Sequence, residues 1–103
     1  MRQNYYHEKA IVRKLVAQAL SDNMRLSVDD GLTLNDVQDF DTIWAIVDSV
    51  EESVIKMNHD NGNYCGYVHL ISGLGNEILA DNSFFCEKHI TEANALCDKL
   101  SDI

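Results

Sequence analysis

Apolar residues recur at helical spacing in three separate segments of the chain. In residues 6–20 they form a single stripe, made of Ile11, Val12, Leu15, Val16 and Ala19. A stripe with this spacing is typical of an amphipathic helix. The same pattern predicts a short helix after Asp41, which we expect to be its N-cap, and a C-terminal helix that begins near Ser83. Asn23 suits the left-handed residue that ends many helices.

Between these segments apolar and polar residues alternate, as they do in strands. Alternation predicts strands over residues 24–28, 32–34, 52–58, 64–72 and 77–81. Asp30-Gly31 and Asn61-Gly62 lie between consecutive strands. Such pairs indicate tight hairpins, in which both turn residues need positive φ. Residues 64–72 carry apolar side chains on both faces, Val68 and Leu70 on one and Tyr67 and Ile71 on the other, which predicts a central strand.

The order of these elements predicts an α+β fold. It reads αββαβββα, with two antiparallel strand groups and helices packed on one face of the sheet. A chain of 103 residues without proline, repeat or linker is expected to form one compact domain over residues 1–103. No apolar run is long enough for a membrane span, and the N-terminus lacks the apolar stretch of a signal peptide. We therefore expect a cytoplasmic protein.

Charge is distributed unevenly along this chain. The formal net charge is −9, and the segment from Asp29 to Asp60 holds nine acidic residues against one base, Lys56. The first 27 residues are basic, with five Lys or Arg against two acids. Negative charge disfavours nucleic acid and anionic membranes as partners, because both are bound mainly through Lys and Arg. It favours a protein partner with a basic surface. The candidate binding residues are Asp29, Asp30, Asp36, Asp39, Asp41, Glu51 and Glu52.

Each charged group also has an ordinary structural explanation. Asp30 suits a turn, and Asp39 and Asp41 suit the start of a helix. The acids form one binding surface only if the fold brings the turn, the helix start and the strand start to the same side. In the first helix, Lys9 and Arg13 lie four residues apart near Lys14; these bases indicate either a solvated helix face or a weak phosphate contact.

The chain contains no motif that specifies a reaction or a cofactor. Three cysteines, Cys65, Cys86 and Cys97, are an odd number, and buried free thiols are expected in a reducing compartment. Cys65 and His69 share a strand face but lie about 13 Å apart, too far for one zinc ion. Cys86 and His89 are three residues apart, and no third ligand or orienting group accompanies them. No oxygen-rich stretch fits a calcium-binding loop.

Several segments resemble small uncharacterised proteins of phages, prophages and plasmids. They are Val16–Leu20, Leu26–Gly31, Gly66–Ile71, Glu77–Asp81 and Ala93–Leu100. These residues are mostly core and turn positions, so the resemblance concerns the fold more than an activity. By analogy of size and charge, it implies an accessory protein of a mobile element, of the kind that includes inhibitors of host defence.

Three functional hypotheses follow. The first is a non-enzymatic acidic protein that binds a protein partner, one form being a nucleic-acid-mimicking inhibitor of a host defence factor. The second is a homodimeric interaction module that associates through the sheet face around Tyr67, His69 and Ile71, or through an open strand edge. The third is a small enzyme or metal protein that uses Cys86, His89 or His69. The first is favoured, because no catalytic set can be named.

Overall fold

The computed structural model describes residues 5–101 of the chain. Its elements confirm the predicted αββαβββα order, with two short 3₁₀ helices added late in the sequence. In chain order they are α1 (Tyr5–Ser21), β1 (Arg25–Asp29), β2 (Leu34–Asp36), α2 (Phe40–Ser49), β3 (Glu52–Asn58), β4 (Tyr64–Ile71), η1 (Gly75–Glu77), β5 (Leu79–Asn82), η2 (Phe84–His89) and α3 (Thr91–Ser101).

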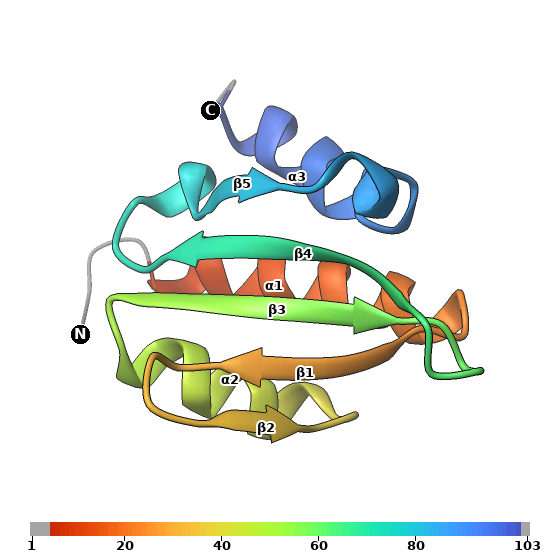
Figure 1. Cartoon of the computed structure of the whole chain (residues 1–103). Helices are drawn as coiled ribbons and strands as arrows, with labels where there is room; N and C mark the ends of the chain where they lie inside the picture. The colour runs from red at the N-terminus through yellow and green to blue at the C-terminus, as the bar shows by residue number, and fades with distance from the viewer. Residues whose placement is uncertain (1–4, 102–103) are drawn as a thin grey trace.

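All five strands form one antiparallel sheet, in the order β2-β1-β3-β4-β5 (Figure 1). The two predicted strand groups are joined by β1 and β3, which pair over five residues from Arg25↔Asn58 to Asp29↔Val54. The prediction of a central strand at residues 64–72 is confirmed, because β4 lies between β3 and β5. The two edges of the sheet are its shortest strands, with three residues in β2 and four in β5.

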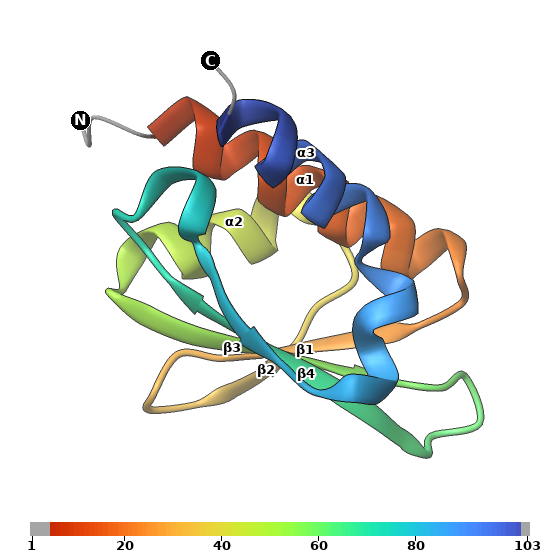
Figure 2. The same ribbon diagram turned by 90° about the horizontal axis from the view of Figure 1, so that it is seen from above.

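The helices cover one face of the sheet, as the pattern predicts (Figure 2). α1 lies over the middle of the sheet, with α3 packed beside it toward β5, and α2 covers the side of β1 and β2. On the sheet side the core between the layers is mostly apolar, because alternate residues of the central strands are buried: Leu26, Val28, Ile55, Met57, Val68 and Leu70, with Ser53 as a buried polar neighbour. The stripe of α1 meets them with Ile11, Val12, Leu15, Val16 and Ala19. This sequestered surface is the main stabilising contribution to the fold.

Both hairpins form, but their turns differ from the predicted geometry. Gly31 and Gly62 have positive φ, whereas Asp30 and Asn61 do not. The loops are longer than two residues, and β2 begins at Leu34 rather than two residues earlier. In the first loop the Asp30 carboxylate accepts the N–H groups of Leu32 and Thr33. The N–H groups of this loop thus donate to a side-chain carboxylate, whereas in a two-residue turn they would donate to backbone carbonyl groups.

Helix boundaries differ from the predictions at two places. Asp39, not Asp41, is the N-cap of α2: its carboxylate accepts the Thr42 N–H at 2.9 Å, and Asp41 lies in the first turn. The segment after Ser83 forms η2 before α3 begins at Thr91. Similarly, the last strand begins two residues later than expected, at Leu79. The predicted stop after α1 is confirmed, because Asn23 has φ 63° and the Met24 N–H donates to the Ala19 carbonyl.

Candidate protein-binding surface

Within residues 5–101 no helix lies over one face of the sheet, and we call this the open face (Figure 2). Since side chains alternate along each strand, the residues between the buried ones must point to this side. The open face therefore carries Asp29, Asp36, Glu52, Val54, Lys56, Tyr67, His69, Ile71 and Asp81, together with Arg25 and Leu34. Most of the residues on the central strands are half-buried, and those on the edges are exposed.

A row of directly opposed residues crosses four strands of the open face. Asp29 pairs with Val54, Val54 with His69, and His69 with Asp81. With neighbouring strands about 4.8 Å apart, this places the backbones of Asp29 and Asp81 about 14 Å from each other. Val54 and His69 thus lie in the middle of the row, and the carboxylates of Asp29 and Asp81 lie at its two ends.

Polar side chains on the open face form diagonal contacts. Nε2 of His69 lies 3.2 Å from Oε1 of Glu52, and the Tyr67 hydroxyl donates to Oδ2 of Asp81 at 3.4 Å. The negative charge of Asp81 raises the pKa of Tyr67 above its ordinary value. At the β2 edge, Nη2 of Arg25 and Oδ2 of Asp36 lie 2.6 Å apart and both side chains are exposed. Exposed pairs of this kind add little stability, so the groups remain available to a partner.

A shallow hollow of about 190 Å³ lies at one end of the open face, lined by Asp29, Gly31, Glu52, Ser53, Val54 and His69. Two of its lining groups are carboxylates, and one is the imidazole that pairs with Glu52. The hollow has the size of a side-chain pocket rather than of a small-molecule site, which typically exceeds about 300 Å³. Its charge suits a Lys or Arg side chain of a partner.

The structure divides the acids predicted to bind a partner. Asp29, Asp36 and Glu52 are on the open face. Asp30 lies in the β1–β2 loop, and Asp39 and Asp41 lie at the start of α2, in the helix layer. Glu51 lies between α2 and β3, where its carbonyl accepts the Ser72 N–H. The seven residues therefore do not share one surface, and three of them share the open face.

Two of the remaining acids have local structural roles. Hydrogen bonds from the Thr33 and Leu32 N–H groups hold the pKa of Asp30 below its ordinary value. The N–H of Thr42 does the same for the pKa of Asp39. Both carboxylates stabilise backbone that would otherwise lack acceptors, a loop in one case and a helix start in the other. This is the structural alternative considered for them from the sequence.

Asp81 belongs to the open face and was missed by the sequence reasoning. It lies beyond the acidic segment that ends at Asp60, so counting charge along the chain could not find it. The signal that could have found it is alternation, because Asp81 is opposite His69 across the sheet. The predicted last strand ends at Asp81, but the sequence does not say which residue lies opposite it. The side of the sheet to which Asp81 points was therefore not predictable.

Candidate nucleophiles and metal ligands do not come together in residues 5–101. The Cys86 thiol donates to the Tyr67 carbonyl at 3.0 Å, whereas Nδ1 of His89 lies 2.9 Å from Oδ2 of Asp22. No hydrogen bond between Cys86 and His89 is found in this part of the chain. Likewise, no group of three or more His, Cys, Asp and Glu among the described residues could hold a metal ion. His89 is buried.

The expectation that Cys65 and His69 share a strand face is wrong. Asn58 pairs with Tyr64 and Met57 with Gly66, so the register shifts and Cys65 has no opposite residue. Cys65 is buried and its thiol donates to the Phe85 carbonyl, whereas His69 is on the open face. Burial raises the pKa of Cys65 and, together with Asp98, that of Cys97. Both thiols therefore stay protonated near neutral pH, which makes them poor nucleophiles.

The bases of α1 contact aromatic rings of the protein itself. The Arg13 guanidinium lies 4.2 Å from the centre of the Phe40 ring, and Nζ of Lys9 lies 5.7 Å from that of Tyr5. Phe40 is in turn stacked on Trp44 at 6.4 Å between ring centres. These contacts favour a structural role for the basic helix face over a phosphate site.

Comparison of the chain with protein-family models, with curated proteins and with solved structures gives no match. Among residues 5–101, no helix has both the length and the apolar character needed to cross a bilayer.

Proposed function

We propose that this protein is a non-enzymatic binding protein whose open face engages a basic surface on a protein partner. The observation that carries the proposal is the gathering of Asp29, Asp36, Glu52 and Asp81 on the sheet face that none of the described helices covers. An uncovered sheet face is an accessible area on which another protein can dock without rearrangement of the fold.

The open face combines charge with apolar contact area. Val54, Tyr67 and Ile71 are half-buried between the carboxylates, so a partner would gain both hydrophobic and electrostatic contacts. Carboxylates around such a patch accelerate association with a basic protein and select against acidic ones. The hollow at Asp29 and Glu52 would receive one cationic side chain.

A nucleic-acid-binding groove is the kind of basic surface that suits this face. Such grooves place Lys and Arg where phosphates bind, and the same side chains form charge-assisted hydrogen bonds with carboxylates. Occupation of the groove by the open face would block nucleic acid. In this form of the proposal the protein is an accessory protein of a mobile element that inhibits a host defence factor.

A homodimer through the same face is a weaker candidate. Two copies placed face to face would bring Glu52, Asp81 and Asp29 of one copy against the same acids of the other. Like charges opposed across an interface cost several kcal/mol. The interface predicted around Tyr67, His69 and Ile71 therefore suits a basic partner better than a second copy.

The test compares two variants of equal charge in capture from a host-cell extract. The variant D29N/E52Q/D81N removes three charges from the open face, and E77Q/E92Q/D98N removes three exposed charges elsewhere. We expect the wild type and the second variant to retain the same basic protein at low salt and to release it at high salt, and the first variant to lose it. Purified partner should then bind with an affinity reduced at least tenfold by the open-face changes.

Two results would contradict the proposal. One is equal binding of the partner by both variants, which would place the site elsewhere on the molecule. The other is an affinity that does not change with salt, since charge pairs at an exposed face are screened by ions. Circular dichroism of both variants serves as the folding control.

A further inference from the structure

Two adjacent phenylalanines of η2 are exposed, which is unusual for so small a protein. Phe84 has 77 % and Phe85 71 % of its surface accessible. Their rings meet edge to face, with centres 5.6 Å apart and planes at 83°. Tyr64 is also exposed, and it lines a hollow together with Phe85. Single exposed apolar residues are common, but a contiguous group of aromatic rings marks an interaction site.

The 3₁₀ geometry of η2 explains why these rings point outward. With three residues per turn, residues i and i+3 lie on the same side. Cys86 and His89 are both buried and anchored, Cys86 to the Tyr67 carbonyl and His89 to Asp22. The exposed sides therefore hold two columns, Phe84 with Glu87 and Phe85 with Lys88. Turning either ring into the core would break the anchors of η2.

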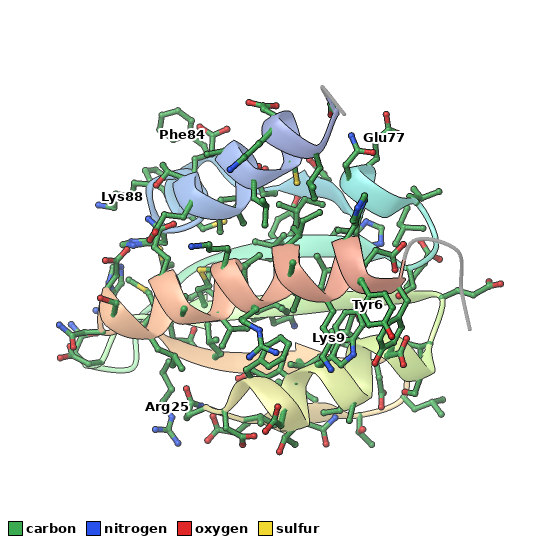
Figure 3. All side chains as sticks on the ribbon, turned by 180° about the vertical axis from the view of Figure 1, so that it is seen from behind. Tyr6, Lys9, Arg25, Glu77, Phe84 and Lys88 are labelled. Carbon is green, nitrogen blue, oxygen red and sulfur yellow. The ribbon has the colours of Figure 1, made fainter. Side chains whose placement is uncertain are left out.

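The four exposed residues of η2 and Tyr64 form what we call the aromatic patch. A hollow of about 260 Å³ is lined by Phe84, Phe85, Glu87 and Lys88. A second, of about 250 Å³, shares Phe85 and Lys88 with the first and is also lined by His59, Tyr64 and Cys65. Figure 3 shows Phe84 and Lys88 projecting from the same end of the molecule. Each hollow is large enough to admit an aromatic ring.

We propose that the aromatic patch is the interface of a two-fold symmetric homodimer. The patch is self-complementary, which is the requirement for a contact between identical surfaces. It has apolar rings flanked by one acid, Glu87, and one base, Lys88. Across a two-fold axis Glu87 of each copy meets Lys88 of the other, and the rings of each copy enter the hollows beside Phe85. The patch has no net charge, whereas the open face repels a second copy.

The area of the patch sets the expected strength of the dimer. An aromatic side chain buries about 150–250 Å², so Phe84, Phe85 and the exposed part of Tyr64 supply about half of the roughly 800 Å² per partner found in stable complexes. The polar rim at His59, Glu87 and Lys88 supplies more. We expect dissociation constants in the micromolar range, about −8 kcal/mol. This proposal does not depend on the function of the open face.

Sedimentation of the full chain from about 5 μM to about 500 μM tests the proposal. The wild type is expected to shift from monomer to dimer over this range. F84S/F85S is expected to remain monomeric, whereas the control variant L32S/L74S, which removes two exposed leucines elsewhere, should still dimerise. All of these positions are exposed, so thermal midpoints should change little.

Charge reversal distinguishes a two-fold contact from any other association. E87K and K88E each place like charges at both ends of the interface, so each alone should weaken the dimer at least tenfold. The double variant E87K/K88E restores the pairs and should dimerise again. An equimolar mixture of E87K and K88E should form a heterodimer, because each lysine then meets a glutamate.

A wild type that stays monomeric at the highest concentration overturns the proposal, as does a dimer that F84S/F85S leaves intact. Loss of the dimer in F84S/F85S without any effect of charge reversal overturns the two-fold arrangement. Restoration in the double variant and in the mixture supports it.

Discussion

Oε2 of Glu8 accepts the backbone N–H of Gly75 at 2.8 Å, and the same oxygen accepts the N–H of Gly73 at 2.9 Å. Glu8 lies in the first turn of α1 and is completely buried. Its carboxylate thereby joins the start of the chain to the loop that follows the central strand β4. Gly73 and Gly75 both have positive φ, and this backbone conformation lets the two N–H groups converge on one oxygen.

We predict that Glu8→Ala lowers the free energy of unfolding by about 2–4 kcal/mol. The substitution leaves two buried N–H groups without this acceptor, and each such group costs about 1–3 kcal/mol. Glu8→Gln keeps one acceptor oxygen and should cost less. Urea unfolding measures the change, with exposed Glu77→Ala in η1 as the control. Unchanged hydrogen exchange of the Gly73 and Gly75 amides in Glu8→Ala would contradict the assignment.

Gly66, which lies in β4, should tolerate substitution poorly. A Cβ atom at this position would lie 2.1 Å from Oγ of Ser83 and 3.1 Å from Cβ of Cys86. Gly66→Ala must therefore push η2 away from β4, with a cost of about 1–3 kcal/mol typical of overpacking. Thermal unfolding measures it, and dimerisation through the aromatic patch should weaken in parallel.

A double-mutant cycle isolates the cause of that cost. Ser83→Ala removes the nearest atom but also the acceptor of the Tyr67 N–H, so alone it should destabilise. Combined with Gly66→Ala it should cost less than the sum of the two. Strict additivity would show that Ser83 is not what the added methyl group meets.

The stability of α2 should depend on pH through Asp39. The pKa of this carboxyl is lowered in the folded state, so its ionised form favours folding at neutral pH. That contribution is complete above the unfolded pKa of about 4 and is lost as the pH falls through the lower folded value. The difference in urea midpoint between the wild type and Asp39→Asn should therefore shrink between pH 5 and pH 2. Asp98→Asn, which removes an exposed charge from α3, is the control for net charge.

The three thiols should react slowly in the native protein. All are free; Cys65 and Cys86 are buried and Cys97 is half-buried. Because burial raises the pKa of Cys65 and Cys97, little thiolate is present near pH 7.5. Ellman's reagent should label all three only after addition of denaturant. Rapid labelling of Cys86 in the folded protein would instead revive the cysteine-enzyme hypothesis.

Helices and strands were predictable here because their periodicities differ and their apolar faces are regular. The stripe of α1, the strand over residues 52–58 and the stop at Asn23 follow directly from local patterns. The lengths of the turns do not follow from local patterns, because Asp30 and Asn61 accept hydrogen bonds from nearby N–H groups, which lengthens the loops. The start of α2 was placed wrongly because Asp39 and Asp41 are chemically equivalent N-caps, and only the backbone decides between them.

The candidate binding surface was less predictable than the fold. Its members come from all five strands, and their common face depends on pairing partners such as His69 and Asp81 that no local pattern specifies. The exposure of Phe84 and Phe85 was hidden for a different reason. An α-helix has 3.6 residues per turn and a 3₁₀ helix has three, so the same side chains point in different directions in the two. The sequence pattern predicted an α-helix from Ser83, whereas the segment forms a 3₁₀ helix.

The short edges of the sheet limit how copies of this protein can associate. β2 offers three residues and β5 four, so joining two sheets edge to edge would gain only a few backbone hydrogen bonds. Asp36 on β2 and Asp81 on β5 add charge at those edges. These edges thereby disfavour growth of the sheet into fibres. Copies of the protein associate instead through side-chain contacts, and such an assembly stops growing once one partner is bound.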